Sequence, residues 1–545
     1  MPQLSPSAVD PSGLPDSTGA PAAASASAHA FYAHALEILC ASGLPFLVAG
    51  KIPFDSDEAV EGLMARHVLN GELPAFFWGQ AYKGVPEVYA SAAAFTLFGS
   101  SVTVLKSVTL VFFAVYVAIN FILLDRILSR WTAVCASLLL IAAPPALVFW
   151  TLDASAEYVI IMLLGTALLI LVETAKSPEQ RAQSRWLFAV GLVVALGLWV
   201  HQLFIVYLVP LAIVVWTRQA WPRRIEVRHL NPLAVAIGAI AGVYLVLAVV
   251  AFVSGGFSLR LASVAISATA PQKMARIAIA VLALAAIVQV AATTSSARAR
   301  DLVRRRWPAA AGFLIGYAPV LIYSILVEPA RSPARVANLQ QLLGAAPDIF
   351  GNIFPILAGF KIATTERLPL PLIAILPGAA ALAAYVWSSR RRLSADFFSL
   401  FVVFFPVVFL LSGAYIDTQS YRYFIPWYAG LAVAWAVGSF ALARKRAAAA
   451  SLIVTAIMGV HIWQQVIWYR KLQPDTQSLA TIACLKRNGI RGGYAEYWTA
   501  YKLTFLAREE IVVAPLDGVD RYPRYTEFVR SLPPHARIDD TARCN

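Results

Sequence analysis

Long runs without a charged side chain constrain the fold of this chain more than any other feature of its sequence. Residues 233–254 and 309–327 contain no Asp, Glu, Lys or Arg, and 449–460 is a shorter run of the same kind. A run of about 18 or more apolar residues can cross a bilayer as a helix. Only 14% of the 545 residues are charged and 59% are hydrophobic, unlike a soluble domain. The chain is therefore predicted to be an all-α polytopic membrane protein.

The apolar segments predict about 13 transmembrane helices. Their ranges are 34–51, 101–124, 131–150, 157–173, 186–200, 203–217, 233–254, 277–294, 309–327, 371–388, 397–413, 425–442 and 449–468. The fifth and sixth segments are separated only by His201-Gln202. One unbroken helix over both would be too long for a bilayer, so a break is expected at this pair.

Basic residues set the predicted topology, because short cytoplasmic loops carry an excess of Lys and Arg. Every second loop is basic: Arg126 and Arg130; Lys176, Arg181 and Arg185; Arg218, Arg223, Arg224 and Arg228; Arg298, Arg300, Arg304, Arg305 and Arg306; Arg390, Arg391 and Arg392; Arg444, Lys445 and Arg446. The N-terminus is then cytoplasmic and the C-terminal region lies outside, in what we expect to be a bacterial inner membrane. This placement accounts for the net charge of +14 without a nucleic-acid partner.

Three parts are expected along the chain. Residues 1–30, rich in Ala, Ser and Pro, are predicted to be a disordered cytoplasmic tail. Residues 31–468 form the transmembrane domain, with a first outer loop at 52–100. Residues 469–545 are predicted to be a small extracytoplasmic α/β domain, with helices over 476–486 and 499–508 and strands at 493–497 and 511–514. If it lies outside the cytoplasm, its Cys484 and Cys544 could form a disulfide.

Four carboxylates crowd the start of the first outer loop, at Asp55, Asp57, Glu58 and Glu61. Asp55 with Glu58 three residues later is the pattern of a helix capping box, and Asn70-Gly71 predicts the end of that helix. The helix is expected to be amphipathic and to lie on the membrane surface. Capping accounts for Asp55 and leaves Glu58 open, but it does not require Asp57, which shares a helix face with Glu61.

Several short motifs resemble a known family. They are Phe54-x-x-Asp57-Glu58 after the first span, Asn70-Gly71-x-x-Pro74, Tyr82-x-Gly84, Phe98-Gly99-Ser100-Ser101 and Tyr421-Arg422-Tyr423-x-x-Pro426. In these motifs and in its expected topology the chain resembles the GT-C glycosyltransferases that use polyprenyl-phosphate sugars, the protein-mannosyltransferase and aminoarabinose-transferase-like group. The resemblance covers most of residues 34–470.

The resemblance implies a catalytic aspartate in the first outer loop, which here is Asp57 with Glu58 as its neighbour. It implies a polyprenyl-phosphate sugar as donor, a lipid, glycan or protein as acceptor, and inversion at the anomeric carbon. The expected site needs one carboxylate to deprotonate the acceptor and cations to neutralise the departing phosphate. No cofactor is expected. The spacing of Asp55-Ser56-Asp57 leaves a divalent metal possible, but the lipid-phosphate chemistry does not require one.

Other outer-face residues are candidates for binding substrate or phosphate. Arg422 is the first of the cations, because arginine binds phosphate through two hydrogen bonds, and Lys83 is the second. The remaining candidates are Tyr82, Tyr421, His201, Asp153 and Glu157. Alternative roles stay open for several of them: Tyr82 and Trp78 as membrane-interface anchors, Glu157 as a helix N-terminal charge, and His201 as a hydrogen-bonding group of its turn.

A transporter or flippase of lipid-linked substrates is the alternative function. Transporters tend to contain internal repeats and charged residues near the membrane midplane. We find no convincing repeat in this sequence, and its acids gather in a loop rather than within a span. These features favour the transferase.

Overall fold

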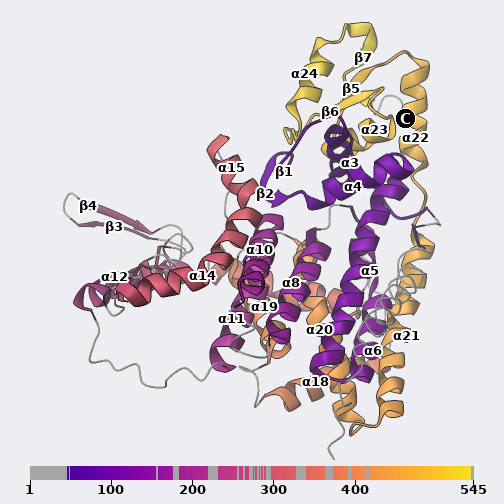
Figure 1. The fold of residues 1–545 in the computed structure, drawn as a ribbon. Helices are drawn as coiled ribbons and strands as arrows, with labels where there is room; N and C mark the ends of the chain where they lie inside the picture. Colours follow the sequence, from indigo (N-terminus) through magenta and orange to yellow (C-terminus); the bar gives the residue numbers. More distant parts are fainter. Residues whose placement is uncertain are drawn as a thin grey trace, which may run out of the picture.

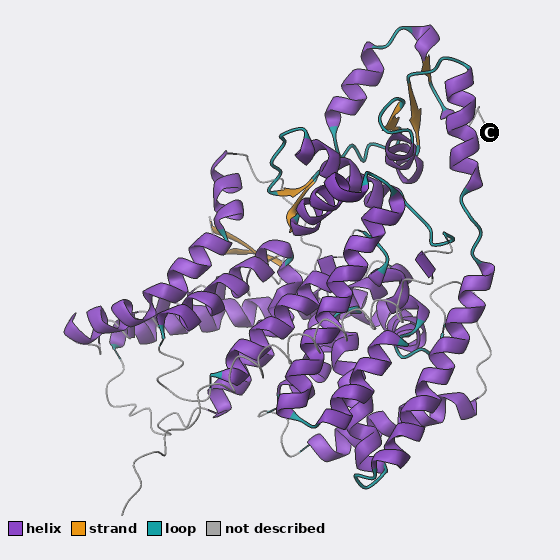
Figure 2. Ribbon diagram, turned by 45° about the vertical axis from the view of Figure 1, so that its right-hand side comes forward, coloured by secondary structure: helices purple, strands orange, loops and turns teal. Residues whose placement is uncertain are grey.

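The computed structural model describes most of the chain in segments (Figure 2). The described residues are 46–47, 50–154, 157–175, 183–218, 231–254, 257–261, 264–268, scattered positions between 274 and 292, 296–326, 339–361, 372–390, 396–412 and 417–541. The predicted disordered tail 1–30 and most of the first predicted span, 34–51, lie outside them.

A bundle of apolar helices forms the larger part of the molecule (Figure 1). It consists of α5 (Val102–Ile127), α6 (Arg130–Ile141), α7 (Pro145–Thr151), α8 (Glu157–Thr174), α10 (Ser184–Val200), α11 (Ile205–Arg218), α18 (Leu372–Ser389), α19 (Phe397–Ser412), α20 (Trp427–Leu442) and α21 (Ala447–Lys471). Its core contains large buried rings such as Trp435, Tyr428 and Phe401. The expected break at His201 is confirmed, because that residue is extended and ends α10 before the short 3-10 helix η1 (Gln202–Phe204).

Three helices in the described residues are long and apolar enough to cross a membrane: α5, α12 (Pro232–Ser254) and the helix that begins at Ala447. Two bent pairs raise this number to at most five. They are α6 with α7, bent by 81°, and α14 (Ser296–Gly316) with α15 (Ala318–Leu326), bent by 58°. The larger count of about 13 spans stays a prediction.

The α6–α7 bend has a sequence cause. Pro144 and Pro145 cannot donate backbone hydrogen bonds, so α6 ends at Ile141 and α7 starts in a new direction. Helix α21 satisfies the carbonyls exposed by the break. His461 Nδ1 donates to Ala142 O at 3.0 Å, and Gln465 Nε2 donates to Ala143 O at 2.6 Å. After the bend, the segment that follows α7 contacts Lys106 of α5 and Glu58 of the first loop.

Helices α12 and α14 extend sideways from the bundle, beside the hairpin of β3 (Phe257–Leu261) and β4 (Val264–Ala268) (Figure 1). Helix α14 packs tightly on α10 because glycines line the contact. A Cβ at Gly191 would lie 2.0 Å from Ala309 O, and one at Gly312 would lie 2.1 Å from Phe188 O. Residues 298–306, which we expected in a loop between spans, are helical and belong to α14, and their cytoplasmic position stays a prediction.

A second, smaller layer covers one end of the bundle and is called here the upper layer (Figure 1). Its first part is α3 (Ser56–Leu69), β1 (Phe76–Phe77), β2 (Gln80–Gly84) and α4 (Pro86–Phe98). Its second part is α22 (Thr476–Arg487), β5 (Gly492–Ala495), α23 (Tyr497–Leu506), β6 (Val512–Pro515), α24 (Pro523–Ser531) and β7 (Arg537–Ile538). The three strands of this second part form a parallel sheet in the order β6-β5-β7.

The two parts of the upper layer share one hydrophobic core. Helix α23 lies against α3 so closely that a Cβ at Gly62 would be 2.4 Å from the Phe505 ring, and Phe505 also packs on Phe54. Trp78 stacks on Tyr522 with 3.9 Å between ring centroids, which ties the two parts together, and its role as a membrane-interface anchor stays a prediction. The prediction that α3 lies on the membrane surface is wrong, because α4 and α23 cover it.

The remaining described elements are short helical segments. They are α16 (Leu339–Asp348), the π-helical turn η3 (Ile349–Ile353), α17 (Phe354–Leu357) and the 3-10 turn η5 (Thr418–Phe424); a last 3-10 turn, η6 (Pro534–Ala536), precedes β7. Of these, η5 carries the Tyr421-Arg422-Tyr423 motif to the side of the bundle that faces the upper layer.

Candidate functional site

Helix α3 begins with the predicted capping box. Asp55 Oδ1 accepts a hydrogen bond from the Glu58 amide at 3.1 Å, and Glu58 Oε2 accepts one from the Asp55 amide at 3.4 Å. Burial, together with the negative charges of Asp153 and Asp57, raises the pKa of Asp55 to about 7. Asp55 is therefore a helix cap, as the sequence predicted.

Glu58 is the anchor of α3. Its two carboxylate oxygens lie 2.5 and 2.8 Å from Lys106 Nζ, and its Oε1 also accepts from the Ala154 amide at 2.9 Å. Both side chains of this ion pair are buried. The Lys106 ammonium group also donates hydrogen bonds to the carbonyl oxygens of Pro53 and Leu152, at 2.8 and 3.2 Å. The contacts of Glu58 thus fasten α3 to α5 and to the segment that follows α7.

Asp57 differs from these two acids in its access to solvent. Its side chain is 26% exposed. Its Oδ1 accepts a hydrogen bond from the Tyr497 hydroxyl and lies 3.9 Å from Nη2 of Arg521. Both partners come from the C-terminal part of the upper layer, and the sequence did not predict either contact. Asp57 is therefore placed where a carboxylate can meet a substrate.

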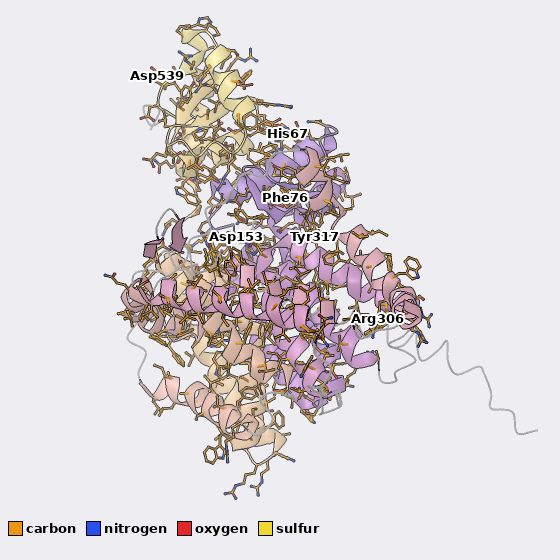
Figure 3. All side chains as sticks on the ribbon, turned by 90° about the vertical axis from the view of Figure 1, so that its left-hand side faces the viewer. His67, Phe76, Asp153, Arg306, Tyr317 and Asp539 are labelled. Atoms are coloured by element: carbon orange, nitrogen blue, oxygen red, sulfur yellow. The ribbon has the colours of Figure 1, made fainter. Side chains whose placement is uncertain are left out.

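Three more carboxylates of this region are buried, those of Glu61, Glu87 and Asp153. Burial raises the pKa of Glu61 to about 8, and its Oε1 has no hydrogen-bond partner among the described residues. Burial, with the nearby Glu61, also raises the pKa of Glu87 well above its ordinary value, and Glu87 accepts a hydrogen bond from the Thr109 hydroxyl. Figure 3 shows Asp153 where the bundle meets the upper layer.

The predicted residues Lys83, Glu157, His201 and Tyr82 lie together. Lys83 Nζ is 3.0 Å from Glu157 Oε2, and the Lys83 backbone pairs with that of His201 in an isolated antiparallel bridge. Burial disfavours the charge on Lys83, but Glu157 and Glu61 outweigh it and raise the Lys83 pKa. The Tyr82 ring meets the His201 ring edge-on, with 6.0 Å between centroids.

The His201 side chain makes a hydrogen bond within its own turn, which was one of the two roles that the sequence left open. Its Nδ1 accepts a hydrogen bond from the Leu203 amide at 3.0 Å. Burial lowers its pKa, which leaves the ring neutral at pH 7. Glu157 is the first residue of α8 and also the ion-pair partner of Lys83. The same carboxylate therefore supplies the negative charge at the helix N-terminus and the partner of the lysine.

Arg422 approaches the same region from η5. Its Nη2 is 3.4 Å from the Tyr423 hydroxyl, and within the described part of the chain no carboxylate lies at ion-pair distance from it. The Arg422 side chain is nevertheless within electrostatic reach of Asp57 and Tyr158. Its neighbour Tyr421 is buried, which raises the Tyr421 pKa to about 12.

The structure therefore brings Asp57, Lys83, Tyr82, Glu157 and Arg422 within electrostatic reach of one another in one site, with the buried Asp153 nearby. Glu58 and Tyr421 are buried within its supports. Sequence reasoning missed Tyr497 and Arg521, because no local spacing links residues of the C-terminal region to the first loop. It noted Glu61 only as sharing a helix face with Asp57. Chemically, the site offers one partly exposed carboxylate and an arginine without a carboxylate partner in the described chain.

Solved structures resemble this fold only distantly. ArnT from Cupriavidus metallidurans in the apo state matches with a TM-score of 0.49 and 10% identity, over 96% of this chain and 90% of that chain. The same protein bound to undecaprenyl phosphate matches with a TM-score of 0.46 and 11% identity, over 95% and 90%. The Archaeoglobus fulgidus oligosaccharyltransferase with zinc and sulfate gives 0.44 and 12%, over 85% of this chain and 58% of that chain. No family model and no curated protein matches the chain.

Proposed function

We propose that this chain is a membrane glycosyltransferase that moves a sugar from a polyprenyl-phosphate carrier to an extracytoplasmic lipid, glycan or protein. The observation that carries the proposal is the pairing of Asp57, a partly exposed carboxylate, with Arg422, which has no ion-pair partner in the described chain and lies within electrostatic reach of it. Proton removal and phosphate stabilisation are the two tasks of this reaction, and the site offers one group for each.

In this mechanism Asp57 accepts the proton of the acceptor hydroxyl or amine as the acceptor attacks the anomeric carbon. The bond from that carbon to the phosphate oxygen breaks, and the polyprenyl phosphate leaves with both electrons of the bond. Attack opposite the leaving group inverts the anomeric centre. Arg422 would stabilise the departing phosphate through two charge-assisted hydrogen bonds.

The supporting charges fit the same reaction. Lys83, although paired with Glu157, keeps a positive charge at the base of the site. Burial raises the pKa of Glu61 and of Glu87, which favours their neutral forms and reduces the negative charge that an incoming phosphate meets. The site as a whole can therefore admit an anion next to Asp57.

The proposed location is a plasma membrane, with the upper layer on the outer side and the N-terminus in the cytoplasm. Cys484, in α22, is disulfide-bonded. Disulfides persist in oxidising compartments and are rare in the cytosol, so this bond supports an outer position for α22. The predicted partner, Cys544, lies outside the described residues.

Mass spectrometry of surface glycans and lipid-linked sugars in a deletion strain tests the proposal. We expect one surface glycan to lose a sugar and the matching polyprenyl-phosphate sugar to accumulate. Re-expression of the wild-type chain should restore both. A defect in substrate uptake with every glycan and lipid-linked sugar unchanged would instead indicate a transporter.

A further inference from the structure

Tyr497 stands between the first outer loop and the C-terminal region. It is the first residue of α23, and only 4% of its surface is exposed. Its hydroxyl donates to Asp57 Oδ1, and its oxygen accepts a hydrogen bond from Nε of Arg521 at 3.1 Å. A guanidinium can only donate, so the proton of the Tyr497 hydroxyl has to point toward Asp57. The direction of both hydrogen bonds is therefore fixed.

Arg521 is itself held from two sides. With its amide turned so that the oxygen faces the guanidinium, Gln80 accepts from Nη1 at 3.1 Å and from Nη2 at 2.8 Å. On the other side, the Arg521 amide donates to the hydroxyl of the buried Tyr501 at 2.7 Å. Arg521 thus links β2 of the first outer loop to the C-terminal part.

The backbone of Tyr497 is also fixed. Its amide donates to Asp517 Oδ2 at 3.1 Å, and the helix that follows packs against α3 through Phe505 and Gly62. The phenol therefore reaches Asp57 from a rigid element. A general base works best when its carboxylate is held in the productive orientation, and a misplacement of about 1 Å can cost 100-fold in rate.

We propose that Tyr497 is a positioning residue for Asp57, so that the C-terminal region completes the active site. This inference rests on the proposed function and deepens it. The Tyr497 hydroxyl occupies Oδ1 and sets the plane of the carboxylate, which leaves Oδ2 to take the acceptor proton. Arg521 acts one step further away, because its hydrogen bond orients the Tyr497 hydroxyl.

Charged groups from several elements act on Asp57. Asp55 lies on the same turn, and Arg422, Arg521 and Lys83 approach from η5, from the segment after β6 and from β2. Loss of the Tyr497 hydroxyl leaves these charges in place, so Tyr497→Phe removes one contact of the Asp57 carboxylate without changing the charge of the site.

The test compares Tyr497→Phe with Tyr494→Phe. The control removes a tyrosine hydroxyl from β5, and within the described residues that hydroxyl makes no hydrogen bond. Each variant is expressed in membranes of the deletion strain, which supply donor and acceptor, and free polyprenyl phosphate is measured by mass spectrometry over a range of donor concentrations. Thermal unfolding of the purified variants checks folding.

For Tyr497→Phe we expect a rate about 10-fold lower at saturating donor, with an unchanged half-saturating donor concentration and an unfolding temperature close to that of the wild type. Tyr494→Phe should match the wild type, and Arg521→Gln should lower the saturated rate by less than Tyr497→Phe does. A wild-type rate in Tyr497→Phe would overturn the inference alone. A slower Tyr497→Phe variant with a lowered unfolding temperature or a raised half-saturating donor concentration would also overturn it, since that pattern indicates a structural role. Absence of transfer by the wild type would remove the proposed function itself.

Discussion

The carboxylate of Glu58 and the ammonium of Lys106 form an ion pair at 2.5 Å in which the side chains are 1% and 2% exposed. Removing one partner of such a pair leaves a buried, uncompensated charge and costs about 3–5 kcal/mol. We therefore expect Lys106→Met to lower the unfolding temperature strongly in detergent, as measured by tryptophan fluorescence.

The matched control for Lys106→Met is Lys486→Met. Lys486 pairs with Glu510 at 2.6 Å, but these side chains are 49% and 62% exposed, so the pair should contribute less than about 1 kcal/mol. Equal unfolding temperatures for the two variants would show that Glu58 and Lys106 do not anchor α3.

Substitutions of Glu61 test whether its side chain is protonated in the folded protein. Burial raises its pKa to about 8, so the side chain is neutral at pH 7, and glutamine is its closest neutral replacement. Glu61→Gln should keep wild-type stability, whereas Glu61→Ala should destabilise by about 2–4 kcal/mol because it leaves a cavity. Chemical denaturation of both variants measures the difference. A Glu61→Gln variant as unstable as Glu61→Ala would mean that Glu61 works as an anion.

Arg422 should contribute to donor affinity. Substituting it with Gln removes a cation that can bind phosphate, and we expect the affinity for undecaprenyl phosphate to fall about 10- to 100-fold. Arg422→Lys should recover part of the lost affinity, since lysine supplies the positive charge but not the two parallel hydrogen-bond donors of a guanidinium. Binding can be measured by native mass spectrometry, with the exposed Arg446→Gln as control. Unchanged affinity in Arg422→Gln would place the phosphate elsewhere.

His67 predicts a pH dependence of stability. It contacts Glu509 at 3.0 Å and Glu72 at 3.1 Å, joining the two parts of the upper layer (Figure 3). Burial opposes the charge on His67, but these two hydrogen-bonded carboxylates raise its pKa. A raised folded-state pKa gives stability that is full below the ordinary value of about 6.5 and lost as pH rises through the folded value.

The unfolding temperature of the wild type should therefore fall between about pH 6 and pH 8, and His67→Gln should remove that part of the slope. At lower pH the same contacts weaken for a different reason. Glu72 and Glu509 have lowered pKa values, so their contribution is present above their ordinary range and is lost as pH falls through the folded values. An identical slope in the wild type and in His67→Gln would exclude His67 as its source.

Local chemistry explains what the sequence could predict. The capping pair Asp55–Glu58 and the Asn70 end fix α3 within a few residues, because both signals act within one turn. The break at His201 follows from bilayer thickness and from the polar pair His201-Gln202 inside a long apolar stretch. Each of these predictions depended on neighbours in the sequence.

Long-range packing explains what it could not predict. Helix α3 has apolar residues at the spacing of a surface helix, but α23 covers it, and Gly62 is the place where Phe505 packs closely. The hydrogen bond from Tyr497 to Asp57 joins residues 440 positions apart, so no spacing rule could find it. The arginines of α14 read as a loop under the rule that short cytoplasmic loops are basic, but they belong to a helix that continues into the apolar segment.

Sugar transfer by Asp57→Asn, measured beside the wild type in membranes of the deletion strain, tests the central claim most directly. Asparagine keeps the shape of the side chain and can still accept a hydrogen bond from Tyr497, but it cannot take a proton. We predict that release of polyprenyl phosphate falls by at least about 100-fold, as expected for loss of a general base, while the unfolding temperature stays close to that of the wild type. Full transfer by a folded Asp57→Asn protein would contradict the role of Asp57 as the base.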